Sequence, residues 1–211
     1  MSVVLALIAL LAFAGSAVAA PRDDALKALD DRADPMARRL ALRTLAATGT
    51  MEDVPRIAQM LRDPDRGVRQ LADAVLWEVW SRSGDAEVDA LFANGVQEMS
   101  EGRWKEAAAT FTTIIRRKPE FAEGWNKRAT VHYLMGDYTK SLADCDEVMR
   151  RNPFHYGALS GYGMIYGQLD DPQRALEFYE QALGVNPNLD GVRNTVEILR
   201  NELIRRRRES I

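Results

Sequence analysis

The second half of the chain repeats its pattern of small, large and polar positions every 34 residues. Pro119, Pro153 and Pro187 mark the period. The same interval relates three further sets of residues, two of them small and one mostly large: Gly95, Ala129 and Gly163; Ala107, Ser141 and Ala175; Phe111, Cys145 and Tyr179. A period of this length predicts a stack of helix pairs, each too small to bury its apolar face alone.

The residue types within the period fit two helices per unit. Small residues are expected where the two helices cross closely, and large residues fill the space beside them. Each proline ends a second helix, because it lacks an amide hydrogen and disfavours helix before it. Turns at Gly102, Gly136 and Asp170 separate the helices within a unit.

These positions resemble the tetratricopeptide repeat family over residues 88–187. The middle repeat, Phe121 to Pro153, is closest to the pattern, whereas Asp170 replaces the loop glycine in the third. The resemblance implies three repeats over residues 85–187 of an all-α solenoid. It also implies a non-catalytic adaptor whose first helices line a concave groove that binds a peptide or a helix.

The resemblance assigns groove positions by register in the second and third repeats. They are Asn126, Lys127, Thr130, Tyr133, Leu134, Gly157, Ser160, Gly161, Met164 and Gln168. We expect Lys127 to be exposed. The first repeat adds Phe92, Val96 and Met99, although Phe92 and Met99 can instead pack internally.

One version of this groove holds a C-terminal carboxylate with Lys, Asn and Arg at set positions. Here Phe92, Val96, Gly157 and Gly161 stand at such positions, so a reader of chaperone tails is not expected.

Four glycines fall within one predicted helix, Gly157 to Gly167. Each interior glycine costs about 0.5 to 1 kcal/mol relative to alanine. Gly163 is explained by helix crossing. Gly157 and Gly161 predict close approach of a partner backbone; the alternative is that they relieve crowding within the fold.

Residues 21–84 form a different helical region, with helices expected over residues 35–47, 52–61 and 65–82. Residues 52–83 resemble a HEAT-type repeat, and the resemblance implies that Asp65 and Arg69 tie neighbouring turns together. Trp77 and Trp80 are expected to bury against the first tetratricopeptide helix, or else to form an exposed binding patch.

The last segment, residues 188–211, predicts a capping helix with a basic tail. Leu189, Val192, Val196, Leu199 and Leu203 follow steps of three and four, as on one face of a helix. The tail, Arg205, Arg206, Arg207 and Arg208, is either a solvated helix end or a weak contact to an anionic envelope surface.

Residues 1–20 contain no charged side chain and end in small residues, with Ala17, Val18 and Ala19 forming an A-x-A pattern. This pattern predicts a signal peptide and therefore an exported protein of the periplasm or cell envelope. The alternative is an uncleaved anchor, because the apolar run is near the lower limit for a membrane span.

Composition narrows the chemistry further. One cysteine, Cys145, excludes an internal disulfide and a multi-cysteine zinc site, and the net charge of -3 argues against a strongly basic nucleic-acid protein. No cofactor or metal is expected. Two alternatives stay open: an enzyme or enzyme subunit that uses Cys145, His132 or His155, and a self-assembling structural solenoid. Asp144 is expected on a solvated helix face.

Overall fold

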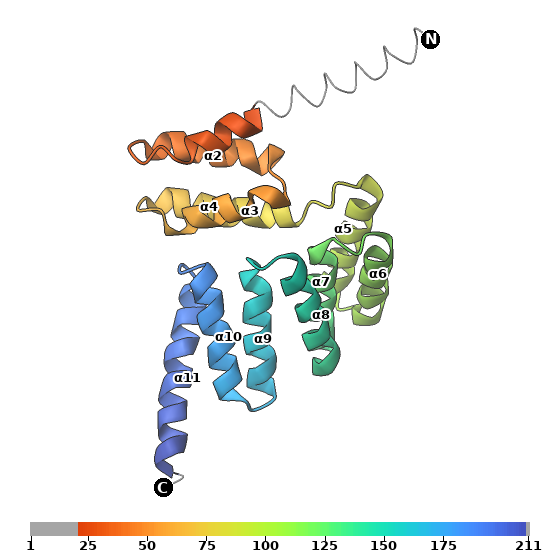
Figure 1. The fold of residues 1–211 in the computed structure, drawn as a ribbon. Helices are drawn as coiled ribbons and strands as arrows, with labels where there is room; N and C mark the ends of the chain where they lie inside the picture. The colour runs from red at the N-terminus through yellow and green to blue at the C-terminus, as the bar shows by residue number, and fades with distance from the viewer. Residues whose placement is uncertain (1–20, 210–211) are drawn as a thin grey trace. The chain divides into compact units, whose positions relative to one another are not determined.

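The computed structural model describes residues 21–209, and within them every regular element is a helix. This confirms the predicted all-α class. The chain divides into two compact units, one ending at Val79 and the other beginning at Trp80 (Figure 1). The proposed signal peptide, residues 1–20, lies outside the described residues.

The first unit contains short helices. After a helical stretch at residues 21–28, the elements are α2 (Pro35–Thr48), η1 (Met51–Asp53), α3 (Val54–Gln59), η2 (Met60–Arg62) and α4 (Arg66–Trp80). Asp34 caps α2, since its carboxylate accepts a hydrogen bond from the amide of Met36. The predicted helices at 35–47 and 65–82 are present. The segment predicted as one helix at 52–61 instead consists of the short helix α3 with a 3-10 turn on each side.

Ion pairs join the helical segments of the first unit. Arg38 donates to both carboxylate oxygens of Asp63 at 2.7 and 2.9 Å, and both side chains are buried. Asp65 does tie two helical segments together, but its partner is Arg39, at 2.6 Å. Arg69 instead donates to the carbonyl oxygens of Asp63 and Pro64 in its own turn. The HEAT-type resemblance thus anticipated a linking role for Asp65 but not its partner.

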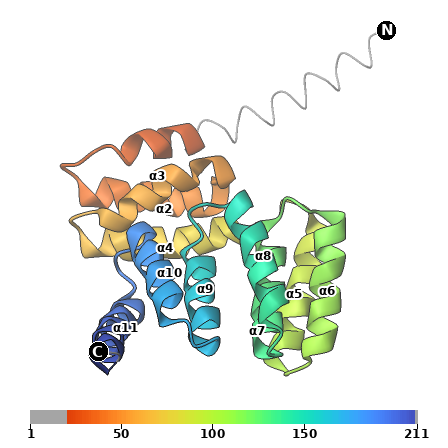
Figure 2. The same ribbon diagram turned by 60° about the horizontal axis from the view of Figure 1, so that its bottom comes forward.

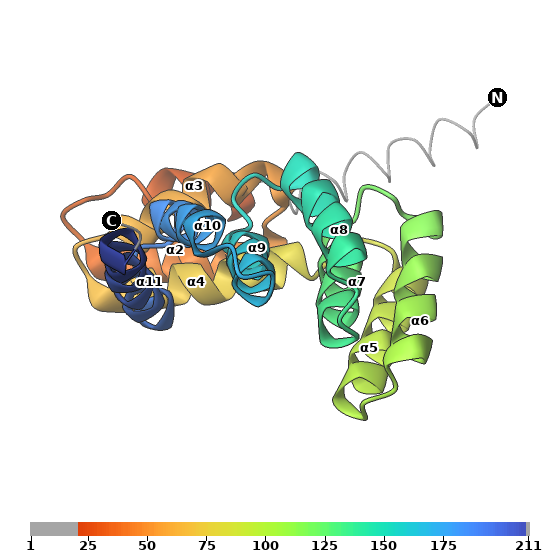
Figure 3. The same cartoon turned by 90° about the horizontal axis from the view of Figure 1, so that it is seen from below.

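The second unit consists of helix pairs in chain order. Its helices are α5 (Ala86–Ser100), α6 (Trp104–Arg117), α7 (Ala122–Leu134), α8 (Tyr138–Arg151), α9 (Tyr156–Gln168), α10 (Pro172–Val185) and α11 (Asp190–Glu209). Each odd-numbered helix up to α9 packs on the helix that follows it, and α11 packs on α10 (Figures 2 and 3). The predicted repeats and capping helix are therefore present.

The turns between paired helices use left-handed backbone. Gly102 and Gly136 have φ of 72° and 77°, which glycine adopts without a steric cost. Asp170 holds the matching place in the third repeat with φ of 54°. Aspartate is one of the residues that tolerate this conformation, so the turn persists without its glycine.

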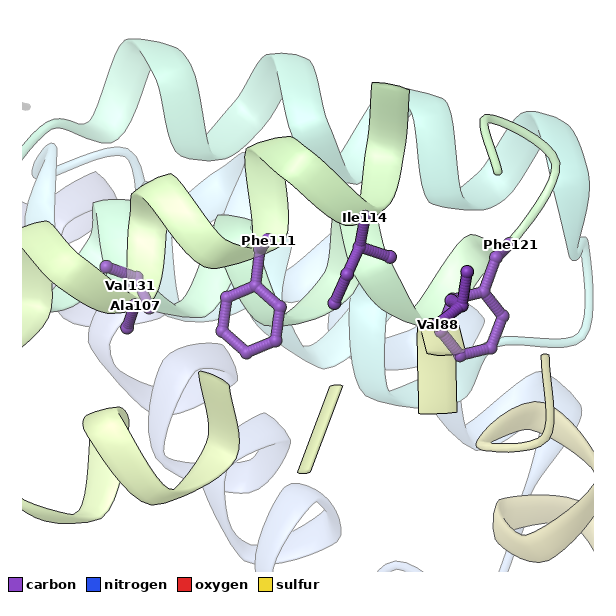
Figure 4. Packing of buried hydrophobic residues seen from close by; sticks show 6 residues of the cluster. All are labelled: Val88, Ala107, Phe111, Ile114, Phe121 and Val131. Atoms are coloured by element: carbon purple, nitrogen blue, oxygen red, sulfur yellow. The ribbon is translucent and has the colours of Figure 1, made fainter. Parts of the chain in front are cut away.

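Clusters of buried residues hold the second unit together. One draws side chains from α5, α6, α7 and the residue before α7: Val88, Ala107, Phe111, Ile114, Phe121 and Val131 (Figure 4). Another joins α7, α8 and α9, and a third joins α10 to α11 through Ala175, Tyr179 and Val196. Each cluster spans consecutive helices, as expected for a solenoid whose repeats contact only their neighbours.

Candidate functional site

The three repeats close their helix crossings differently. A Cβ atom on Gly95 would lie 2.8 Å from the ring of Phe111, and one on Gly163 would lie 2.7 Å from the ring of Tyr179. These contacts are too short for any side chain, so both glycines are required, as predicted. In the middle repeat the matching residues are Ala129 and Cys145, and a thiol fills much less space than an aromatic ring.

A pocket of about 110 Å³ lies beside this middle crossing. Helices α7, α8 and α9 supply its lining: Asn126, Ala129, Thr130, Tyr133, Ser141, Cys145, Gly157, Ala158, Gly161, Met164 and Ile165. Six of the ten predicted groove residues are among them. None of the lining residues carries a charge, so the pocket is neutral and mostly apolar.

Glycine at position 161 is not required by the packing around it. A Cβ atom there would meet the sulfur of Cys145 at 3.7 Å, an ordinary contact distance. Gly167, on the same helix, has no atom within 4 Å of such a Cβ. At Gly161 the wall of the pocket is therefore more open than the helix crossing at Gly163.

The other four predicted residues lie outside the pocket. Leu134 is 48% exposed, Gln168 is exposed, and the hydroxyl of Ser160 donates to the carbonyl oxygen of Tyr156 within its own helix. Lys127 is not the exposed side chain expected from the sequence. It is only 28% exposed and its ammonium lies 3.7 Å from the buried carboxylate of Glu123.

The first repeat contributes less to a groove than its register indicates. Phe92 packs edge-on against Phe111 and Phe121, with ring centroids 6.0 and 5.5 Å apart. Met99 packs against the same cluster. Both residues therefore take the internal alternative, and Val96, at 40% exposure, is left on the surface.

A buried polar network stands behind the pocket. The carboxylate of Glu123 is fully buried and accepts from Nε2 of His155 at 2.5 Å and from Nδ2 of Asn126 at 3.1 and 3.2 Å. The other ring nitrogen of His155, Nδ1, accepts from the amide of Ala158 at 3.0 Å and so caps α9. Burial raises the pKa of Glu123, but the bonds from His155 and Asn126 and the charge of Lys127 outweigh it and hold that pKa below its ordinary value.

Sequence reasoning missed Glu123 and this role for His155. The available signal was the register: His155 stands 34 residues from Phe121 in the second repeat and from Leu189 before the capping helix, and both of these residues are apolar. A histidine there is expected to be buried, and a buried histidine needs a partner. Trp80, the first residue of the second unit, stacks on His155 with centroids 4.6 Å apart. It also lies against Tyr156, with centroids 5.2 Å apart, so both ring contacts are at the start of α9.

The three residues considered for catalysis have separate environments. Burial raises the pKa of the Cys145 thiol to about 12, which keeps it protonated and unreactive. Burial lowers the pKa of His132, whose Nε2 lies 3.8 Å from a carboxylate oxygen of Asp144. Asp144 is buried rather than solvated, and Arg128 donates to both its oxygens at 2.7 and 2.9 Å. His155 is the buried helix cap described above.

Two features are absent from residues 21–209. No group of three or more potential metal-ligating side chains occurs among them. No helix among them is both long enough and apolar enough to cross a bilayer.

The chain matches tetratricopeptide proteins in sequence. The tetratricopeptide repeat family model matches residues 120–187. A TPR repeat-containing protein of Rhizobium etli is 33% identical over 142 residues, which cover 67% of this chain and 69% of that protein. Hsp70-Hsp90 organizing protein 1 of Glycine max is 26% identical over 107 residues, covering 49% of this chain but only 19% of the relative.

Solved structures show the same fold at lower identity. The first TPR domain of Spaghetti (RPAP3), solved with an HSP90 peptide, has a TM-score of 0.53 at 20% identity and covers 56% of this chain and 93% of that domain. The Sgt2 TPR domain of Aspergillus fumigatus has a TM-score of 0.55 at 21% identity, covering 59% and 83%. With the helix pairs, the crossing residues and the Rhizobium relative, these matches establish that the chain belongs to the tetratricopeptide repeat proteins.

Proposed function

We propose that this protein is an exported adaptor that binds a segment of another protein in the pocket between α7 and α9. One observation carries the proposal: an uncharged, mostly apolar pocket lies on the first helices of two successive repeats, beside a wall of two glycines. Pockets of this kind suit apolar side chains with a few polar groups to fix orientation.

The similar solved structures support a peptide ligand for this chain, but the pocket does not suit the acidic peptide of the Spaghetti domain. The Spaghetti domain was solved with the HSP90 peptide SRMEEVD, which is acidic and ends in a carboxylate. The pocket lining in this chain holds no lysine, arginine or histidine. An acidic tail therefore finds no counter-charge there, and a neutral segment is the better fit.

The same geometry supports a non-catalytic role. The thiol of Cys145 is held in its protonated form, and both ring nitrogens of His155 are engaged in hydrogen bonds. A nucleophile needs an adjacent base and an open approach. Neither of these side chains offers that arrangement, which favours the adaptor over the enzyme.

Export and a periplasmic location rest on the sequence of residues 1–20. Sequencing the mature N-terminus tests them: a new terminus next to Ala19 or Ala20 is expected, and an intact Met1 in the membrane fraction contradicts cleavage and favours the anchor. The basic tail gives the envelope only weak support. Arg205 pairs with Glu202, and Arg206 pairs with Glu202 and Asp170.

The groove is tested by crosslinking from Met164, a pocket residue that is 46% exposed. A photoreactive residue at 164 is expected to trap one partner segment in native envelopes, and Gly161→Leu is expected to abolish that product. Gly167→Leu is the matched control, because it adds the same side chain to α9 in open space. Equal crosslinking by both leucine variants rejects the groove as the binding site.

A further inference from the structure

The amide of Asn126 is held in one orientation by the network behind the pocket. Carboxylate oxygens only accept hydrogen bonds at neutral pH. The amide must therefore turn its nitrogen, and not its oxygen, toward Glu123, and Nδ2 lies 3.1 and 3.2 Å from the two carboxylate oxygens. A flipped amide would place two acceptors against each other.

The orientation of Glu123 is fixed in turn from α9. The amide hydrogen of Ala158 points at Nδ1 of His155, so this nitrogen is the acceptor and Nε2 carries the hydrogen. That hydrogen is donated to Glu123. Hydrogen bonds thus link the N-terminus of α9 through His155 to Glu123, which also accepts from Asn126, and both His155 and Glu123 are fully buried.

The remaining atom of the amide is available to a ligand. Oδ1 of Asn126 accepts no hydrogen bond from residues 21–209 and is not sealed from solvent. Asn126 lines the pocket, as do Gly157 and Gly161. The pocket thus presents a fixed hydrogen-bond acceptor beside a wall that a main chain can approach.

We infer that Glu123 and His155 are positioning residues that make Asn126 an acceptor, so that the pocket selects an uncharged peptide segment presenting a main-chain N–H and disfavours a terminal carboxylate. The inference rests on the proposed function. A carboxylate would place a second acceptor against Oδ1 of Asn126 and would meet no cation in the pocket lining. A main-chain N–H, by contrast, donates a hydrogen bond to Oδ1.

Glu123→Gln is the decisive variant because it is nearly isosteric. His155 still donates to the Gln oxygen at the place of Oε1, and the Gln nitrogen takes the place of Oε2, which is the nearer of the two oxygens to Nδ2 of Asn126 at 3.1 Å. This NH₂ group repels Nδ2, so the Asn126 amide is expected to flip and turn Nδ2 into the pocket. Glu120→Gln is the control: it removes the same charge from a side chain that is 68% exposed.

The first readout needs no ligand. NMR hydrogen exchange of the Asn126 side-chain amide is expected to be slow in the wild type and in Glu120→Gln, and at least about tenfold faster in Glu123→Gln, because the NH₂ group leaves a buried carboxylate. Thermal melts confirm that all three proteins are folded. Equal exchange in the wild type and Glu123→Gln overturns the inference.

The second readout uses defined probes. Short acetylated and amidated peptides without charged residues are screened, and each binder is remade with one main-chain nitrogen methylated at a time. In the wild type and Glu120→Gln, one methylated position is expected to weaken binding about tenfold, as for one lost hydrogen bond. In Glu123→Gln that position is expected to lose its effect.

The outcomes separate the two proposals. If no probe binds, or if Gly161→Leu leaves binding unchanged, the proposed peptide groove fails, and amide exchange alone still decides the orientation of Asn126. If probes bind in the groove and the methylation pattern is the same in Glu123→Gln as in the wild type, the groove stands and the positioning role is rejected.

Discussion

At the helix crossing, one pair of positions distinguishes the middle repeat from repeats one and three. The candidate pocket lies beside that pair. Gly95 with Phe111 and Gly163 with Tyr179 pair an absent side chain with an aromatic ring, at distances that leave no space. Ala129 with Cys145 pairs two small side chains, and the pocket lies beside them. The same pair of positions therefore has a closed crossing in repeats one and three and a pocket beside it in the middle repeat.

The largest expected effect concerns the reactivity of Cys145. If the thiol occupies a packed position as Phe111 does, its raised pKa of about 12, against an ordinary value of 9.0, lowers the thiolate fraction at pH 8 about a thousandfold. Alkylation of the native protein is then slower by about that factor than in denaturant, where the thiol is ordinary. Fast native alkylation would mean that Cys145 is not packed like an aromatic residue and would revive the enzyme alternative.

The next effect tests whether the crossings are closed. Gly163→Leu forces a side chain into the ring of Tyr179 and is expected to lower the free energy of unfolding by about 3 kcal/mol. Ala129→Leu adds nearly as much volume but has the pocket beside it, so we expect a smaller loss of about 1 to 2 kcal/mol. Denaturant unfolding of both variants measures the difference. A larger loss for Ala129→Leu would contradict the comparison of the two repeats.

A third prediction converts the middle repeat into the form of its neighbours. Cys145→Phe is expected to fill the pocket, prevent crosslinking from Met164, and cost about 1 to 2 kcal/mol because Ala129 still carries its Cβ. Adding Ala129→Gly recreates the pairing of repeats one and three and is expected to recover about 1 kcal/mol. The double variant should remain unable to bind. No recovery on adding the glycine would show that the crossings are not equivalent.

The smallest effect concerns the turn of repeat three. Asp170→Gly relieves a left-handed residue with φ of 54°, as Gly102 and Gly136 do in the other repeats, and gives up an exposed ion pair with Arg206. Because exposed pairs contribute little, we expect a gain in unfolding free energy of about 0.5 kcal/mol. Asp171→Ala is the control with the opposite sign, since it removes the cap of α10 at a cost of about 1 kcal/mol. Thermal melts distinguish them.

The sequence alone determined the repeat, its helices and the residues at the crossings. The 34-residue period is visible although individual residues differ between repeats, because it reflects the lengths of the helices and the positions of the turns. These depend on local helix propensity and on the spacing of apolar residues. Gly95, Gly163 and Gly102 stand where the register placed them. The same register predicted six residues of the pocket, because equivalent positions lie on the same face of the first helix in each repeat.

Only the tertiary structure decided which polar groups are buried and with whom. Glu123 and His155 are 32 residues apart, so their contact depends on how one helix pair packs on the next. Arg128 and Asp144 are 16 residues apart, and their contact depends on how the two helices of one pair pack together. Neither Lys127 nor Phe92 lines the pocket: Lys127 lies near the buried carboxylate of Glu123 one turn earlier on its own helix, and Phe92 packs against Phe121. A repeat period determines the position of each residue along its helix. The contacts of its side chain also depend on the distances between helices, which the period does not specify.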